Sequence, residues 1–220
     1  MTPRRKDTEP LARGRIVAAA MTIIDTEGLE ALSMRRLGAE LGVNPMAAYY
    51  HVPNKAALYD LVLDAVMTGI DTSAIDPAAA LPEQLKQAAR AYRAAILEHP
   101  RAIPVLAGRS VRTATALRPV EPFLGVLFAA GLTADEALAA VDVVAQYILG
   151  GAVGYYHHLV DSELSEEREF ETLDAAEFPH MSRVLAEGHY VGFEAEFEFG
   201  LDAIVRGLLE GPRYGLQEVR

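Results

Sequence analysis

The sequence contains no cysteine. This absence excludes a disulfide framework, a thiolate zinc site and a thiol nucleophile, and it is compatible with a reducing compartment. The first residues are polar and basic, and they lack the apolar run of a signal peptide. Together these absences favour a cytoplasmic protein.

The sequence also lacks an uninterrupted apolar stretch of membrane-spanning length. Its most apolar long window, residues 137–156, contains Asp142, Gln146 and several glycines, so a buried helix fits it better than a membrane span. Enzyme motifs are missing as well, because we find no nucleophile elbow, no glycine-rich phosphate loop and no histidine–carboxylate motif. We therefore expect no enzyme, no membrane protein, and no bound metal or other cofactor.

What the sequence does contain is helical periodicity along most of its length. Its 220 residues are 51% hydrophobic and 23% charged, which is the balance of a globular protein of one or two domains. Apolar residues recur three and four positions apart, and no strand pattern or internal repeat appears. We predict an all-α fold, with a boundary in residues 71–82, which are rich in Asp, Pro, Ser and Ala.

The net charge of −11 argues at first against a nucleic-acid partner. The charge is unevenly distributed, however: residues 1–70 contain eight Lys or Arg and eight Asp or Glu, whereas residues 71–220 contain 12 and 23. All of the net acidity therefore lies in residues 71–220. Residues 1–15 carry five basic and two acidic side chains, which suits an arm that follows DNA, although a frayed terminus fits equally well.

Residues 33–55 have the pattern of two short helices joined by a tight turn. Ser33 and Asn44 stand where helix N-caps are expected, and Pro45 follows at the first position of the second helix. Gly42 lies where a left-handed residue ends the first helix. The pattern predicts a helix-turn-helix over about residues 33–52, with flanking helices at about 11–26 and 54–69.

Two features of this motif fit an interaction better than they fit stability. Arg35 and Arg36 lie in the first turn of a helix, where the dipole disfavours cations unless an anion such as a DNA phosphate is close. Tyr49, Tyr50 and His51 are consecutive, and three such positions cover about 300° of a helix surface, so at least one ring must face outward. A DNA-reading surface uses such side chains, whereas a small helical hairpin with solvated charges is the plainer alternative.

Residues 11–70 resemble the N-terminal domain of the tetracycline-repressor (TetR) family of transcription regulators. The matching segments are residues 16–28, 32–37, 41–43 and 49–58, and the last, with its aromatic-His-x-x-Asn-Lys-x-x-Leu pattern, is the most specific. The resemblance implies binding to a double-stranded DNA operator. By position, the implied DNA-binding residues are Ser33, Arg35, Arg36, Asn44, Pro45, Met46, Ala47, Tyr49, Tyr50, His51 and Lys55.

A single helix-turn-helix buries too little surface to hold a specific site, so such proteins usually pair across a palindrome. Family members pair through their last long helices, which here are expected at about residues 133–159 and 191–209. Gly150, Gly151 and Gly154 interrupt the first of these, and since each costs about 1 kcal/mol against alanine, close approach of another helix is expected there. The predicted interface residues are Ile148, Tyr155, Phe193, Phe197, Leu201, Ile204, Val205 and Leu208. Packing of both helices inside one subunit is the alternative.

The region 81–160 resembles the tetracycline-repressor subgroup more weakly, notably in Arg118-Pro119-x-Glu121 and in residues 129–133 and 149–151. The resemblance implies a cavity for a small-molecule effector, whose binding moves the helix at 54–69. The predicted lining residues are Tyr92, Ile96, His99, Leu106, Arg109, Tyr147, Gly151 and Tyr155. A salt bridge is the alternative role for Arg109.

Tetracycline-binding members hold a drug-bound magnesium through a His just before a Leu-Gly-Thr segment. This chain has Leu106-Ala107-Gly108-Arg109 there, so we expect neither tetracycline nor magnesium. The expected function is that of a ligand-responsive transcription regulator, a repressor that binds a palindromic operator as a homodimer and is released by a small-molecule effector. The alternatives are an activator of the same family and a helical small-molecule-binding protein whose DNA function has decayed.

Overall fold

The computed structural model describes residues 13–160, 173–188 and 191–210. These residues form helices and turns, and no strand occurs among them, so the predicted all-α fold is confirmed. Most of the expected basic arm, residues 1–12, lies outside the described residues.

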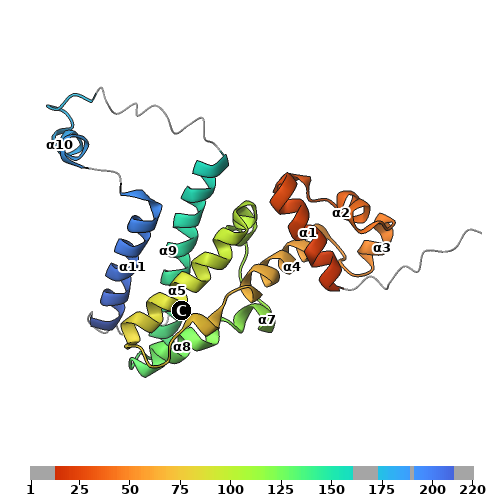
Figure 1. Cartoon of the computed structure of the whole chain (residues 1–220), viewed down its shortest axis with the longest axis horizontal. Coiled ribbons are helices and arrows are strands. Elements are labelled where there is room, and N and C mark those ends of the chain that lie inside the picture. Colours follow the sequence, from red (N-terminus) through yellow and green to blue (C-terminus); the bar gives the residue numbers. More distant parts are fainter. Residues whose placement is uncertain (1–12, 161–172, 189–190, 211–220) are drawn as a thin grey trace, which may run out of the picture.

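Four α-helices and one short 3₁₀ turn form the N-terminal end of the molecule (Figure 1). In chain order they are α1 (Arg13–Glu27), η1 (Leu29–Ala31), α2 (Met34–Leu41), α3 (Pro45–Tyr49) and α4 (Lys55–Thr68). α1 packs on α2 and α4, and its apolar stripe of Ile16, Ile23 and Ile24 is fully buried. α1 ends at Gly28, whose φ of 89° lies in a region that side chains rarely adopt.

Beyond α4, the helices α5, α8, α9 and α11 form a bundle, and α10 lies away from it (Figure 1). In chain order the elements are η2 (Thr72–Ala74), α5 (Leu81–Glu98), η3 (Pro100–Ala102), α6 (Ile103–Ala107), α7 (Ala114–Leu117), α8 (Val120–Ala129), α9 (Ala134–Val160), α10 (Pro179–Glu187) and α11 (Gly192–Glu210). α5 packs against α8, α9 and α11. Residues 114–129 form two helices, α7 and α8, which are separated at Arg118 and Pro119.

The segment that joins the two ends is held against the bundle. The backbone N–H of Asp76 donates to the side chain of Gln87 over 2.8 Å, and the Gln84 amide donates to the carbonyl of Ala79 over 2.7 Å. α4 itself packs against α5, α6 and α7. The N-terminal helices are therefore connected to the bundle through α4 as well as through the chain.

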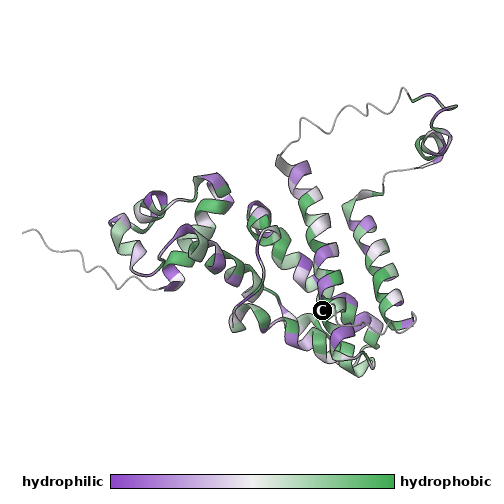
Figure 2. Cartoon of the chain, turned by 180° about the vertical axis from the view of Figure 1, so that it is seen from behind, coloured by the Kyte–Doolittle hydropathy of each residue, from purple (hydrophilic) through white to green (hydrophobic). Residues whose placement is uncertain are grey.

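α9 begins with a reciprocal cap. The Thr133 N–H donates to the Glu136 carboxylate over 2.9 Å, and the Glu136 N–H donates to the Thr133 hydroxyl over 3.3 Å. Residues Ala134–His158 are long and apolar enough to cross a membrane by length and composition alone. However, α9 packs against α5, α6, α8 and α11 of the same chain and buries Val144 and Ile148. In Figure 2 hydrophobic and hydrophilic residues alternate along both α9 and α11, as expected for helices with one buried side.

Ion pairs fix α11 against α5. Lys86 pairs with Asp202, Arg90 pairs with Glu198 over 2.8 Å, and Arg93 pairs with Glu194 over 2.6 Å. The residue numbers of the paired side chains increase along α5 and decrease along α11, so the two helices are antiparallel. Hydrogen bonds from Arg90 and Lys86 lower the pKa of Glu198 and of Asp202 respectively.

Candidate DNA-binding surface and effector cavity

α2 and α3 form the predicted helix-turn-helix. The Ser33 hydroxyl accepts from the N–H of Arg36 over 3.1 Å, and the Asn44 side chain accepts from the N–H of Met46 over 2.9 Å, so both expected caps are present. Gly42 ends α2 in the left-handed region, with a φ of 66°. The sequence did not single out Gly38, yet a Cβ there would lie 3.1 Å from backbone atoms of Pro45. Gly38 therefore permits the close approach of α2 to the start of α3.

The outer side of α3 is exposed and apolar. Met46 is 65% exposed and Tyr50 is 89% exposed, while Ala48 is fully buried against the rest of the domain. Tyr49 and His51 are also exposed. The expectation that at least one of the three consecutive rings faces outward is confirmed, and a helix that presents Met46 and Tyr50 can enter a DNA groove.

The two arginines at the start of α2 differ in their surroundings. Arg36 is paired with Glu27 through hydrogen bonds of 3.0 Å from its Nε, and with Glu40 over 2.8 Å. The anions that offset the helix dipole at Arg36 are therefore these two carboxylates of the same chain. Arg35 is exposed and has no such partner among the described residues. Contacts within the chain thus account for Arg36, whereas the Arg35 side chain remains exposed at the start of α2.

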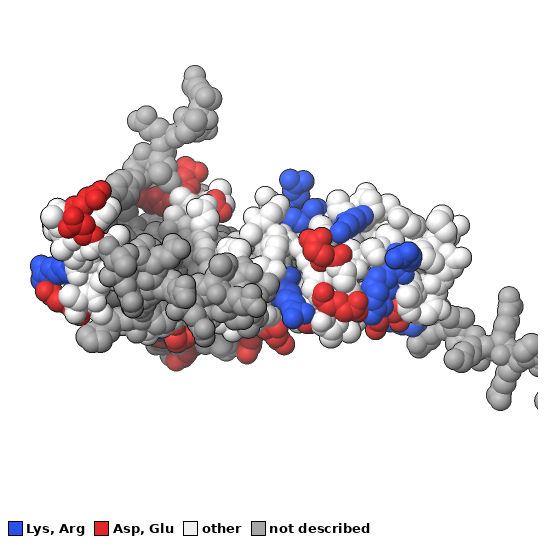
Figure 3. All heavy atoms as spheres, turned by 90° about the horizontal axis from the view of Figure 1, so that it is seen from above, with Lys and Arg blue, Asp and Glu red and all other residues white. Residues whose placement is uncertain are grey.

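The start of α4 adds polar groups beside α3. Asn54 caps α4 by accepting from the N–H of Ala57 over 2.8 Å, and Lys55 lies exposed with its Nζ 5.3 Å from the centre of the Tyr59 ring. Figure 3 shows Lys and Arg interspersed with Asp and Glu over the N-terminal end in that view, without a single broad basic face. In this view the positive charges are therefore local rather than spread over one broad surface.

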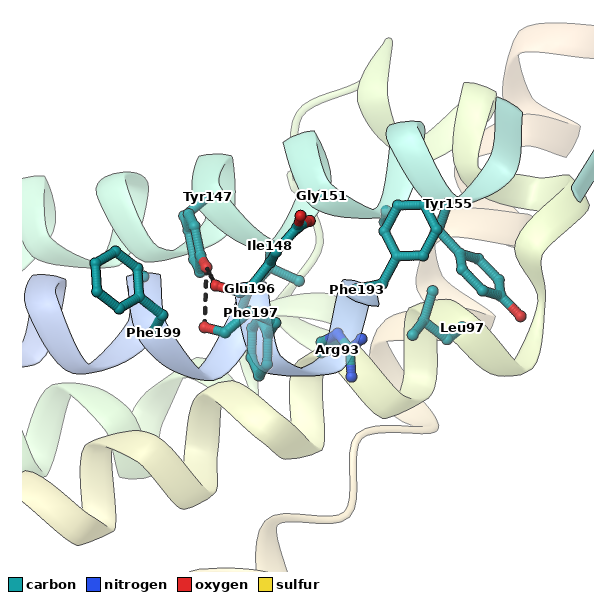
Figure 4. Close-up of a pocket in the computed structure, with 12 residues that line it drawn as sticks. Arg93, Leu97, Tyr147, Ile148, Gly151, Tyr155, Phe193, Glu196, Phe197 and Phe199 are labelled. Atoms are coloured by element: carbon teal, nitrogen blue, oxygen red, sulfur yellow. Dashed lines mark hydrogen bonds between the residues drawn. The ribbon is translucent and has the colours of Figure 1, made fainter. Parts of the chain in front are cut away.

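A cavity of about 320 Å³ lies between α5, α9 and α11 (Figure 4). Its lining is mostly apolar and aromatic: Arg93, Leu97, Tyr147, Ile148, Gly151, Ala152, Tyr155, Phe193, Glu196, Phe197, Phe199 and Gly200. Of the eight predicted pocket residues, Tyr147, Gly151 and Tyr155 line this cavity. The size is within the range of small-molecule sites in proteins.

The other five predicted pocket residues lie elsewhere. Ile96 and Leu106 are buried in the core, and burial raises the pKa of Tyr92 to about 12. His99 lies 2.9 Å from the Asp25 carboxylate of α1. The Nε of Arg109 donates to Asp60 of α4 over 2.8 Å, so the salt bridge that was the alternative for Arg109 is present.

α9 and α11 meet at a glycine that the sequence reasoning missed. The Tyr147 hydroxyl donates to the carbonyls of Glu196 and Phe197 over 3.1 and 2.9 Å, and a Cβ on Gly200 would lie 2.2 Å from that hydroxyl oxygen. Burial raises the pKa of Tyr147. By contrast, a Cβ on any of the α9 glycines, Gly150, Gly151 and Gly154, would meet no other atom of the described chain within 4 Å. The close approach expected at these three glycines therefore does not occur within the subunit.

The residues predicted for the dimer interface differ in how far the subunit itself buries them. Ile148, Phe197, Leu201 and Val205 are buried inside the subunit, with Leu201 fully so, while Tyr155, Phe193, Ile204 and Leu208 are half-buried. These residues pack α11 onto α9 and α5, which was the alternative to a dimer contact. The outward side of α11 instead carries Phe199, 80% exposed.

Two family models match the chain. The model for bacterial regulatory proteins of the tetR family matches residues 16–62, and the model for the tetracyclin repressor-like C-terminal domain matches residues 76–211. The HTH-type transcriptional repressor DrrR1 of Streptomyces coeruleorubidus is 32% identical over 94% of this chain and 80% of its own length. The chain belongs to the TetR family.

Other members agree over most of their length. The class G tetracycline repressor protein of Vibrio anguillarum is 26% identical, over 90% of this chain and 93% of that protein. The crystal structure of the Streptomyces coelicolor TetR family protein ActR in complex with actinorhodin superposes with a TM-score of 0.82 at 29% identity, covering 92% of this chain and 97% of that one. The TetR fold of this chain, a helix-turn-helix domain followed by a larger helical region, is thus shared with a structure that holds a ligand.

At the place where the sequence departs from tetracycline-binding TetR proteins, the structure has no metal-binding arrangement. Leu106 is buried in the core and Arg109 is paired with Asp60. Among the described residues, no group of three or more His, Asp or Glu side chains is arranged to hold a metal ion.

Proposed function

We propose that this TetR-family regulator is a homodimeric repressor, which binds a palindromic operator through α3 and releases it when a small molecule occupies the cavity between α5, α9 and α11. The observation that carries the proposal is that α4 joins the exposed helix-turn-helix directly to the bundle that contains the cavity. DrrR1 is named a repressor, and ActR has been crystallised with actinorhodin. We divide the chain at residue 70, with DNA recognition before it and effector binding and dimerisation after it.

In the proposed DNA complex, α3 reads bases and its neighbours hold the backbone. Met46 and Tyr50 are the most exposed large hydrophobic side chains of the motif, and apolar groups of this kind contact thymine methyls in the major groove. Pro45 and Ala47 are half-buried beside Met46. The exposed Arg35 and Lys55 suit phosphates or base edges, as do Ser33, Asn44, Tyr49 and His51 at the rim of the motif.

For the dimer we propose a corrected face, formed by the outward sides of α9 and α11. Phe199 is 80% exposed and lies beside a surface hollow that Ala203 also lines. Gly150 and Gly154 of α9 are exposed and leave open space where a side chain would stand. A partner helix that packed against these glycines would offset their cost to α9, and pairing would cover Phe199.

Polar contacts between the N-terminal helices and the bundle provide a route by which ligand binding changes DNA binding. Asp60 and Asp64 of α4 accept hydrogen bonds from Arg109 and from Thr113 (2.6 Å), which flank the loop between α6 and α7. Arg101 donates to the carbonyl of Thr26 at the end of α1 over 3.0 Å. Because α6 packs on α9, a ligand that shifts α9 would move α4 and change the spacing of the two α3 helices in the dimer.

Members of this family regulate transcription, and we assign this chain no catalytic role and no cofactor. A DNA-binding repressor works where the chromosome is, so we propose a cytoplasmic location. We keep one second candidate, an activator of the same family, because the direction of regulation depends on where the operator lies.

The proposal is tested by fluorescence anisotropy with a labelled duplex from upstream of the protein's own gene, beside an unrelated duplex, at low and near-physiological salt. We expect selective binding that persists at the higher salt. Met46→Ala should weaken it, whereas Met181→Ala, which alters another exposed methionine, on α10, should not. If the gene's own promoter fails, duplexes selected from a random pool replace it. Equal, salt-sensitive binding to every duplex would contradict the proposal.

A further inference from the structure

The residues that line the cavity indicate which kind of ligand it would bind. Five aromatic residues line it, and four of their rings form two pairs: Tyr147 and Phe197 are stacked with centroids 5.8 Å apart and planes 14° apart, and Tyr155 and Phe193 meet edge to face at the same distance. Figure 4 shows these rings projecting from α9 and α11 on both sides of the space. Such walls accept a flat apolar body.

Two charged side chains line the cavity, and only one of them is already satisfied. The guanidinium of Arg93 donates to Glu194 over 2.6 Å and lies 4.4 Å from the centre of the Phe197 ring, with 18% of the side chain exposed. Its charge is thus neutralised by a carboxylate and its face is covered by a ring. An anionic ligand would have to displace Glu194 to reach it.

Glu196 differs from Arg93 in both respects. It is exposed at the rim of the cavity, and among the described residues its carboxylate has no ion-pair or hydrogen-bond partner. In Figure 4 it projects from α11 toward Gly151 of α9, beside the aromatic walls. A cation could pair with Glu196 without breaking any existing contact, whereas an anion would be repelled by it.

The long-range field favours the same sign. Residues 71–220 contain 12 Lys or Arg and 23 Asp or Glu, so the region that contains the cavity attracts cations and repels anions before contact.

We propose that the cavity binds an amphiphilic aromatic cation, a compound with a flat ring system between Tyr147, Phe197, Tyr155 and Phe193 and a protonated amine paired with Glu196. The inference rests on the proposed function, since it names the chemical class of the effector. Binding would bring the positive group to the rim and leave the ring system inside, so a ligand with separate apolar and cationic parts fits best.

The test is direct titration of the full-length protein, without DNA, with two fluorescent probes of similar size: proflavine, a planar aromatic cation, and 1-anilinonaphthalene-8-sulfonate, an aromatic anion. We expect proflavine to bind more tightly than the anion. Glu196→Gln should weaken proflavine binding tenfold or more. Glu121→Gln, which removes the same charge from an exposed position on α8 outside the cavity, should change it less than twofold.

A second variant locates the site. Gly151→Leu places a side chain in the cavity from a position where a Cβ meets no atom within 4 Å, so the fold should persist while proflavine binding is lost. The cationic assignment would be overturned if the anion bound more tightly than proflavine and Arg93→Gln abolished that binding. It would also be overturned if Glu196→Gln left proflavine binding unchanged. Failure of both probes to bind would overturn the cavity as a site for either class. Operator binding, measured separately by anisotropy, would be unaffected by these outcomes, so failure of the inference is distinguishable from failure of the proposed regulator.

Discussion

The helix-turn-helix and the α9–α11 pair are both made of closely packed helices, but different interactions determine their packing. In the helix-turn-helix the partners are neighbours in sequence, and caps and glycines within a few residues set their angle. In the α9–α11 pair the central contact joins Tyr147 to carbonyls about fifty residues away. Local signals can therefore specify the first arrangement, whereas they specify only that α9 and α11 are helices.

The largest expected effect is the difference between substitutions on the two sides of α11. Leu201 is fully buried, so Leu201→Glu places an unpaired charge in the core, which should cost about 3 kcal/mol or more and prevent folding. Phe199, two positions earlier, is 80% exposed, so Phe199→Glu should remain helical but become monomeric and lose operator affinity. Circular dichroism and light scattering distinguish the two results. A folded Leu201→Glu variant, or a Phe199→Glu variant that stays dimeric, would contradict this assignment of faces.

A smaller effect is expected from two glycine substitutions. Gly200→Ala forces Tyr147 to move and breaks its hydrogen bonds, which should destabilise the protein by about 1–3 kcal/mol. Gly150→Ala meets open space within the chain, so it should stabilise an isolated subunit by up to about 1 kcal/mol. Thermal unfolding measures both changes.

The same pair also tests the dimer face. If a partner helix packs on Gly150, the alanine variant should dimerise less tightly by analytical ultracentrifugation although its subunit is more stable. Unchanged dimerisation would place the partner helix elsewhere.

The sequence could predict the helix-turn-helix in more detail than the packing of α9 against α11. Ser33, Gly42 and Asn44 act within one helical turn, and each adopts the conformation that its residue type favours. The stripe that includes Leu201 was correctly identified as apolar, but an apolar stripe fits a core contact and a subunit contact equally well. Nothing in the local sequence indicated that Gly200, rather than Gly150, would face another helix, because that depends on which residues of α9 and α11 are opposite each other.

Site residues show the same limit. Tyr147, Gly151 and Tyr155, three of the residues predicted for an effector pocket, line this cavity because they share one side of α9. His99 and Arg109 were expected there for their chemistry, yet each is close to a carboxylate of the N-terminal helices. The sequence identifies polar residues, but the tertiary structure decides which partner they meet.

A more modest effect should separate Arg35 from Arg36. Arg35 has no internal partner among the described residues, so Arg35→Ala should weaken operator binding about tenfold or more and leave the melting temperature unchanged. Arg36 is held by Glu27 and Glu40, so Arg36→Ala should lower the melting temperature slightly and change affinity less. Fluorescence anisotropy measures the operator affinity of both variants, and thermal unfolding measures their stability. Equal losses of affinity without a loss of stability would show that Arg36 also contacts DNA.

The smallest expected effect concerns the ion pairs between α5 and α11. Pairing lowers the native pKa of Glu198 and Asp202 below the ordinary values of 4.5 and 3.8. A carboxyl whose pKa is lower in the folded state stabilises that state above its unfolded pKa, and the contribution disappears as the pH falls through the folded value. The melting temperature should therefore fall more steeply between about pH 5 and pH 3 in the native protein than in a Lys86→Met, Arg90→Met double variant. The difference should be small, because the paired side chains remain 21–47% exposed and are screened by solvent. Parallel pH profiles for the two proteins would show that the pairs contribute nothing to holding α11 in place.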